Sequence, residues 1–214
     1  KNFLRDVAEM LDNVLQYFID NAPDAVRRAK YSALRERSIG VGALGLHAHF
    51  QRNNIAFESV VAKVENNKIF KHIRKGLNEA NNQLGRERGE APDAVGTGLR
   101  FSHLMAIAPN ASSSIIMGNT SPSVEPYRAN AYRQDTLSGS HLNKNKYLDR
   151  LIKLKLTINN VLDTEYYNDV WSSIIANDGS VQHLDILSDI EKETFKTSME
   201  IDQRWVIELA SDRQ

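Results

Sequence analysis

The chain has 214 residues, and its 27 lysines and arginines balance its 27 aspartates and glutamates. This balance gives no broad basic field for nucleic acid, and no apolar run approaches the roughly 20 residues that cross a bilayer, so neither partner is expected. The chain has no cysteine, which excludes a disulfide scaffold, a zinc-thiolate site and any thiol chemistry carried by this chain alone. Without a signal peptide at its start, the expected location is cytoplasmic.

Apolar residues recur at three- and four-residue steps from Phe3 to Ile19, which predicts an amphipathic helix that ends near Pro23. A segment with three close glycines follows at 39–46. Its spacing is not that of a dinucleotide fingerprint, and it lacks the strand–turn–helix context of a phosphate loop. The favoured interpretation is a strand or turn whose glycines let neighbouring backbone pack closely, with a phosphate loop as the alternative.

A second long helix is predicted at about 59–87, where Gly85, Gly89 and Pro92 break the pattern. Residues 91–98 are typical of a loop, and 99–108 of a short strand that leads to Pro109. Further helices are predicted at 147–156, 161–175 and 188–212. Helices with two or three short strands between them fit a piece of an α/β barrel or an irregular helical domain.

Several polar groups have a functional and a structural interpretation. His47 and His49 would share one face of a strand, but no carboxylate stands near them to complete a metal site, so two half-buried histidines without a metal are favoured. An acidic run near 185–193 favours a helix start through the helix dipole. Glu36, between two arginines, is interpreted as part of an ion-pair cluster rather than an acid catalyst.

The most unusual stretch is 108–126, which is dense in small hydroxyl residues. A strand is expected to run into it over 104–108 and to stop at Pro109, after which Asn110 or Ser112 could N-cap a short helix. Free backbone N–H groups at such a helix start, with serine hydroxyls beside them, suit a phosphate oxyanion. The alternative is a capped turn whose serines satisfy local backbone groups.

This stretch resembles the substrate-phosphate segment of the large, catalytic subunit of class I ribonucleotide reductases. The resemblance covers almost the whole chain in the same order, through residues 35–42, 98–100, 109–114, 120–126, 130–140 and 202–208. Collinear matches of this length are much more specific than one short motif. The resemblance implies an α/β fold: part of a ten-stranded α/β barrel of the ribonucleotide reductase type, helix-rich, with residues 1–214 forming a single fragment of that barrel domain.

By the same resemblance, five residues would cradle the diphosphate of a ribonucleoside diphosphate, largely through backbone N–H groups: Pro109, Asn110, Ala111, Ser112 and Ser113. The family uses a cysteine thiyl radical and a cysteine pair, together with an Asn and a Glu, and no position here stands for them. No catalytic or metal-binding residue is therefore assigned in this chain. Glu125 would have a structural role near the active site, and Tyr166 and Tyr167 are interpreted as a surface-and-core pair rather than the family's radical-relay tyrosines.

The resemblance also implies what the complete enzyme needs. Its partners would be the remaining parts of the large subunit, a small radical-generating subunit that contains metal, and the ribonucleoside diphosphate substrate. A dithiol reductant and nucleotide effectors would complete the system, and no cofactor is expected in this chain itself.

Two functional hypotheses follow. In the first, the chain is part of a ribonucleoside-diphosphate reductase and supplies the diphosphate loop, but is inactive alone. In the second, it is a non-catalytic binding or interaction module derived from the barrel half. The absence of a starting Met and of capped, polar ends favours the first, and we then expect the isolated chain to be poorly soluble or oligomeric.

Overall fold

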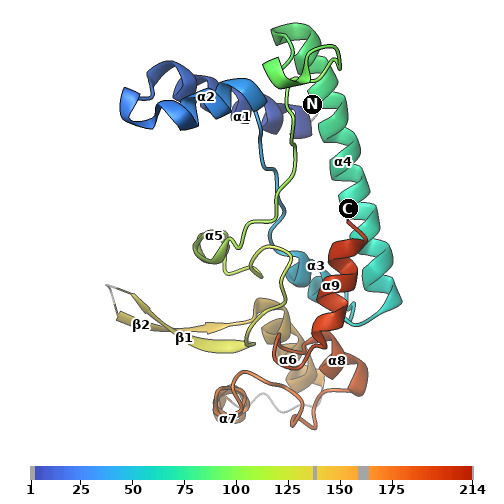
Figure 1. Ribbon diagram of the computed structural model, residues 1–214. Helices are drawn as coiled ribbons and strands as arrows, with labels where there is room; N and C mark the ends of the chain where they lie inside the picture. Colours follow the sequence, from blue (N-terminus) through green and yellow to red (C-terminus); the bar gives the residue numbers. More distant parts are fainter. Residues whose placement is uncertain (1–2, 137–138, 159–163, 214) are drawn as a thin grey trace. The chain divides into compact units, whose positions relative to one another are not determined.

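The computed structural model describes residues 3–136, 139–158 and 164–213 (Figure 1). Two compact units are distinguished within it. Unit 1 consists of residues 1–42 and 67–108, and unit 2 of residues 43–66 and 109–214. None of the helices in the described ranges is long and apolar enough to span a membrane.

Unit 1 is helical and confirms the two long helices that apolar spacing predicts. Its elements are α1 (Phe3–Asn21), the short 3-10 turn η1 (Asp24–Val26), α2 (Arg27–Glu36), most of α4 (Val60–Arg88) and η2 (Pro92–Ala94). The expected interruption at Gly85 is wrong, since α4 continues to Arg88. A side chain at Gly85 would meet the Gly98 carbonyl oxygen at 2.1 Å, so this glycine serves close packing rather than helix termination.

The core of unit 1 joins apolar residues of α1 and α4 to the segments 39–41 and 101–105. Its fully or nearly buried members are Ala8, Ile39, Leu77, Ala80, Leu84 and Phe101. Removal of this apolar area from water is what holds the two helices against the glycine-containing segment.

The glycine segment pairs with the stretch before Pro109. Val41 forms a parallel bridge with Met105, and the Val41 N–H donates to the Leu104 carbonyl at 2.9 Å. A Cβ on Gly40 would lie 2.9 Å from the Ala106 Cβ, and one on Gly42 would lie 2.6 Å from the Ala106 oxygen. Close backbone packing is therefore the role of these two glycines. The strand predicted at 99–108 is present only as this isolated bridge.

The described residues of unit 2 form an antiparallel hairpin and several short helices, and the hairpin extends outward from them (Figure 1). Strand β1 (Ala131–Thr136) pairs with β2 (Gly139–Lys144) in a register that sets Ala131 opposite Lys144. The helices are α3 (Leu46–Arg52), α5 (Ala111–Ile116), α6 (Lys146–Ile158), α7 (Thr164–Ala176), α8 (Asp189–Thr194) and α9 (Gln203–Ser211). The core of this unit packs α6 and α7 together, through Leu148, Ile152, Trp171 and Ile174, with Phe195, the residue that follows α8.

The helix prediction at 147–156 is confirmed by α6, and the one at 161–175 by α7 from Thr164 onward, while residues 161–163 lie outside the described residues. The single helix predicted at 188–212 is wrong, because two short helices occupy this range. The Glu200 carboxylate accepts from the Thr197 N–H at 2.7 Å and its hydroxyl at 2.8 Å, and Asp202 caps α9 by accepting from the Arg204 N–H. These local bonds replace the helical ladder between α8 and α9.

Candidate functional site

The residues predicted to hold a diphosphate form the start of α5. Asn110 occupies the N-cap position with φ 50° and ψ 30°, and its carbonyl accepts from the Ser114 N–H at 2.9 Å. The prediction that Asn110 or Ser112 caps a short helix is thus right for the position of Asn110. It is wrong for the mechanism, because the Asn110 side chain makes no capping bond. The left-handed conformation, which asparagine tolerates, turns the chain into the helix.

The backbone donors at this helix start face no acceptor in the part of the chain that the structure describes. The N–H groups of Ala111, Ser112 and Ser113 precede the first helical bond, and all three residues are exposed. Ser114 differs, since it is buried and its hydroxyl donates to the Ala111 carbonyl at 2.7 Å. Three exposed N–H groups in series form a surface that can bind an anion.

The other end of α5 is held by hydrogen bonds from three side chains. The Tyr132 hydroxyl donates to Asn119 Oδ1 at 2.6 Å, and the Tyr127 hydroxyl donates to the Asn119 carbonyl at 3.2 Å. Lys146 Nζ donates to the Gly118 carbonyl at 3.3 Å. Asn119 has φ 59°, a left-handed conformation that closes the turn after the helix.

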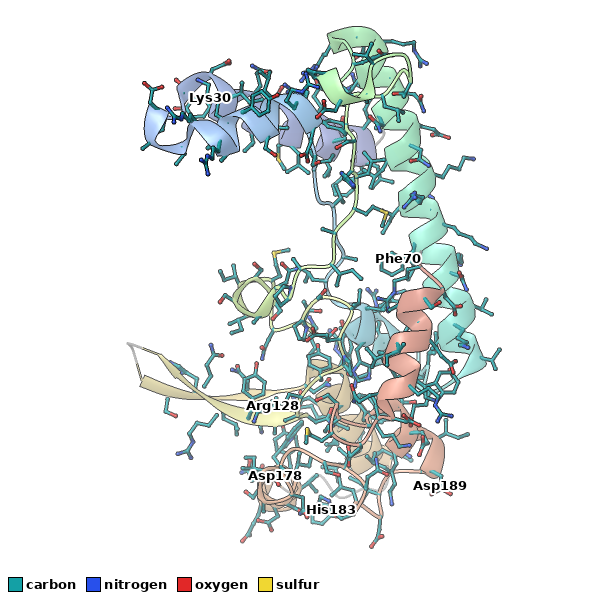
Figure 2. All side chains as sticks on the ribbon, viewed as in Figure 1. Lys30, Phe70, Arg128, Asp178, His183 and Asp189 are labelled. Atoms are coloured by element: carbon teal, nitrogen blue, oxygen red, sulfur yellow. The ribbon has the colours of Figure 1, made fainter. Side chains whose placement is uncertain are left out.

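A pocket of about 540 Å³ lies between α5 and the hairpin side of unit 2. Ala111, Ser114 and Ile115 of α5 line one side of it. The rest of the lining includes Tyr127, Tyr132, Arg133 and, labelled in Figure 2, Arg128 and Asp178. The α5 helix therefore borders an open volume instead of resting on a packed core.

His47 is hydrogen-bonded to the backbone of Tyr127, one of the residues that hold the end of α5. It lies on α3, so the prediction of a strand at this position is wrong, and it is fully buried rather than half-buried. The Tyr127 N–H donates to His47 Nδ1 at 2.9 Å, so Nδ1 has no proton and Nε2 carries it. Burial lowers the pKa of His47 to about 3, with only a small opposing effect from a hydrogen bond to the Thr194 backbone. This imidazole is a neutral acceptor that fixes the backbone of Tyr127.

A chain of buried amides lies beside His47. The Gln51 amide nitrogen is 3.3 Å from His47 Nε2, but both atoms carry hydrogen, so this is a contact and not a hydrogen bond. Asn145 Nδ2 donates to Gln51 Oε1 at 2.7 Å. Asn145 also donates to Asn130 Oδ1 at 3.0 Å, while its own Oδ1 accepts from the N–H groups that begin α6. Asn130 donates in turn to the carbonyls of Gly179 and Phe195. The network ties α3, the hairpin start and α6 together.

The other buried polar cluster belongs to unit 1 and surrounds Asp12. Its carboxylate accepts from Arg37 at 2.7 Å, from Arg88 at 2.8 Å and from Arg100 at 3.0 Å. Burial alone would raise the pKa of Asp12, but the hydrogen bonds from these arginines outweigh it and hold that pKa below its ordinary value. Arg100, from the stretch 98–100, is thus engaged in a structural ion network.

The remaining candidates have structural surroundings. His49 Nε2 lies 3.2 Å from Glu65 Oε1, and no group of three or more metal-binding side chains occurs among the described residues. The acidic run includes Asp189 and Glu191, which lie in the first turn of α8, as the dipole argument predicts, and Glu191 completes a capping box with Ser188.

Glu36 is not in an ion cluster with its neighbours. Its carboxylate accepts from Ser32 and Ser38, while Arg35 pairs with Asp93 and Arg37 with Asp12. The local cluster predicted from adjacent charges is therefore wrong, because the arginines reach partners far away in the sequence.

Three further positions complete the comparison with the sequence. Glu125 is exposed. Tyr166 is exposed, whereas Tyr167 packs against the core of unit 2 and donates to Asp149, as a surface-and-core pair should.

Sequence reasoning missed the residues that hold α5, namely His47 as a backbone acceptor, Asn119 and Tyr132. Single polar residues in loops carry no periodic signal that would find them.

The geometry can be compared with known proteins. A profile of the ribonucleotide reductase barrel domain matches residues 1–94 and 91–214 of this chain. The chain belongs to this family. Its barrel segment is 55% identical over 214 residues to the ribonucleoside-diphosphate reductase large subunit of Invertebrate iridescent virus 6, covering 99% of this chain and 22% of that protein. The vaccinia virus large subunit is 31% identical over 243 residues, covering 98% of this chain and 30% of that protein.

A solved structure agrees with these relatives. The class Id ribonucleotide reductase alpha subunit of Actinobacillus ureae superposes with a TM-score of 0.87 at 40% identity, over 100% of this chain and 38% of that one. The expected fold class, part of an α/β barrel of the ribonucleotide reductase type, is confirmed. This ribonucleotide reductase chain spans between about a fifth and two-fifths of the length of the relatives named here.

Proposed function

We propose that this chain is the part of a ribonucleoside-diphosphate reductase large subunit that binds the diphosphate of the substrate, at Pro109, Asn110, Ala111, Ser112 and Ser113. The observation that carries the proposal is the run of exposed N–H groups at Ala111–Ser113, for which the described residues supply no acceptor. Membership of the family supports it, because the match to the barrel domain includes residues 109–113, which resemble the family's substrate-phosphate segment.

The chemistry of this segment is binding and orientation. Because these N–H groups have no acceptor among the described residues, each can donate to a phosphate oxygen without first breaking a hydrogen bond within the protein. The five residues contain no lysine or arginine, so the backbone supplies the donors and fixes their directions. Holding the diphosphate in this way would present the ribose at a defined place, which is the part of catalysis that comes from proximity and orientation.

The reducing chemistry must come from outside these 214 residues, because they contain no cysteine. We propose that all of residues 1–214 belong to one barrel domain completed by the remaining large subunit. A metal-containing small subunit would generate the radical, a dithiol would supply electrons, and nucleotide effectors would regulate the assembled enzyme. The cytoplasm is its proposed location. Alone, the chain is expected to be inactive.

A pair of substitutions at one position tests the site in the assembled reductase. Ser113→Phe places a ring beside the three N–H groups, and we expect the KM for a ribonucleoside diphosphate to rise well over about tenfold, the equivalent of roughly 1.4 kcal/mol. Ser113→Ala keeps the N–H group and adds no bulk, so its KM should stay within about threefold of the parent.

A third variant controls for bulk on the same helix. Ile116 lies at the other end of α5 and its side chain is 83% exposed, so Ile116→Phe should leave KM unchanged. An unaltered KM in Ser113→Phe would contradict the assignment of the diphosphate site.

A further inference from the structure

The α5 helix is joined to the rest of unit 2 by few polar contacts, and they gather at one end. Among the described residues, the side-chain hydrogen bonds that reach the 109–119 segment from elsewhere end on Gly118 and Asn119. The opposite end, at Ala111–Ser113, is exposed and receives none of them. The orientation of the proposed diphosphate donors is therefore set from the far end of the helix.

Packing adds little to hold the helix. Ser114 is the buried residue of α5, whereas Ile115 is 41% exposed and Ile116 is 83% exposed. The pocket of about 540 Å³ borders Ala111, Ser114 and Ile115, so a tilt of the helix toward the hairpin meets open volume. A helix that buries few side chains depends on its hydrogen bonds for a fixed position.

The shortest of these bonds joins Tyr132 on β1 to the Asn119 side chain, at 2.6 Å. Tyr132 is part of a strand with a defined register, in which it lies opposite Asn143. The Tyr127 bond to the Asn119 carbonyl is longer, at 3.2 Å, but the Tyr127 backbone is itself fixed by His47. Asn119 thus receives one bond from a strand and one from a backbone-anchored loop.

We propose that Tyr132 and Asn119 are positioning residues for substrate binding: their hydrogen bond fixes α5 so that the N–H groups of Ala111–Ser113 converge on the diphosphate. The inference rests on the proposed function of that segment. Both residues act through the orientation of α5. Loss of the bond lets the donors diverge and weakens diphosphate binding while the chemical step, carried by other parts of the enzyme, continues at its normal rate.

The test is a double-mutant cycle in the assembled reductase with Tyr132→Phe, Asn119→Gly and the double variant. Glycine keeps the left-handed backbone at position 119 and removes the amide, so the turn itself is preserved. One hydrogen bond contributes about 1 kcal/mol, so each single variant should raise KM about fivefold with kcat within roughly twofold of the parent. Because the two residues act through one bond, the double variant should be no worse than the singles.

Inorganic pyrophosphate gives a second readout, because it shares only the diphosphate with the substrate. Its inhibition constant should rise by the same factor of about five in each variant. Tyr166→Phe, an exposed tyrosine on α7, is the matched control and should change neither constant.

Each outcome bears on the inference. Raised KM and inhibition constants that are not additive support it. If Ser113→Phe raises KM but Tyr132→Phe does not, the positioning role is overturned and the proposed site stands. If neither variant changes KM, both are overturned. A fall in kcat together with a lower unfolding midpoint would assign the pair a purely structural role and would also overturn the inference.

Discussion

Asp12 in unit 1 and His47 in unit 2 are both fully buried titratable side chains, and their surroundings lead to opposite charge states. Three arginines surround Asp12, so the carboxylate keeps its charge and its pKa is lowered. Among the described residues no ion pair involves His47. Its Nδ1 accepts from a backbone N–H, and burial lowers its pKa to about 3, so it stays neutral.

The charged cluster around Asp12 and the neutral network beside His47 differ in the cost of losing one side chain. In the Asp12 cluster, removal of the carboxylate leaves buried cations without a counter-charge. In the His47 network, removal of one amide leaves neutral groups without a partner, which is less costly. Two equally buried polar residues are therefore expected to contribute unequally to the free energy of unfolding, and substitutions can measure the difference.

The largest effect is expected for Asp12→Asn. The substitution keeps the shape of the side chain but leaves Arg37 and Arg100, which are 3% and 8% exposed, as unpaired buried charges. A loss of about 3–5 kcal/mol in the free energy of unfolding is expected. Urea unfolding followed by far-UV circular dichroism measures it. Asp20→Asn, at an exposed position of the same helix, is the control, and an equal loss there would refute the account.

A pH titration separates the two residues. The folded-state pKa of His47 is about 3 against an ordinary 6.5, so between these values the unfolded state binds the proton and the folded state does not. Stability should therefore fall as pH drops from 6.5, by up to about 1.4 kcal/mol per pH unit from this residue. Asp12 acts lower, below its ordinary 3.8, because its folded pKa is lowered and stability is lost as it protonates.

The His47→Gln variant identifies the source of the slope. Glutamine offers an oxygen acceptor to the Tyr127 N–H but does not titrate, so the part of the slope above pH 4 should shrink. Tryptophan fluorescence is a suitable probe, since both tryptophans, Trp171 and Trp205, belong to unit 2. An unchanged slope would show that His47 is not the titrating group.

A smaller loss is expected for Asn145→Ala. It removes the link between Gln51 and Asn130 and the acceptor at the start of α6, but leaves no unpaired charge. We expect a loss of about 1–3 kcal/mol, monitored by the same fluorescence transition. A loss as large as that of Asp12→Asn would erase the distinction between the charged and the neutral network.

The smallest effect is expected for Arg35→Met. Arg35 pairs with Asp93 in unit 1, but the two side chains are 42% and 38% exposed. Surface ion pairs contribute about 0–1 kcal/mol, so the unfolding midpoint should barely move. A loss comparable to that of Asp12→Asn would mean that burial does not decide the strength of these pairs.

Neither network was accessible from the sequence, although much of the helical framework was. Regular apolar spacing predicts α1, α4 and α6. In α1 the pattern locates the helix but not its buried face, since Phe3, Met10 and Val14 are exposed. The break between α8 and α9 depends on local bonds to the carboxylates of Glu200 and Asp202, and no periodicity encodes them. The hairpin was not predicted, and the strand that was predicted before Pro109 is present only as an isolated bridge.

The candidate site likewise has one part that the sequence predicts and one part that it does not. The density of small hydroxyl residues and Pro109 predicted a helix start near Asn110, and α5 begins at Ala111. The residues that hold its far end, Asn119 and Tyr132, are brought together by a hydrogen bond across 13 positions of the chain. Such a contact follows from the folded backbone, and a single sequence has no local pattern for it.

Reconstitution tests most directly whether this chain builds the diphosphate end of a ribonucleotide reductase active site. The chain would be combined with the remaining large subunit, the radical-generating subunit and a dithiol, and the reduction of a ribonucleoside diphosphate measured. We expect a stoichiometric complex whose turnover requires this chain and whose KM for the ribonucleoside diphosphate rises with Ser113→Phe. Turnover without the chain, or a KM that is unchanged in the Ser113→Phe variant, would contradict this role of the chain.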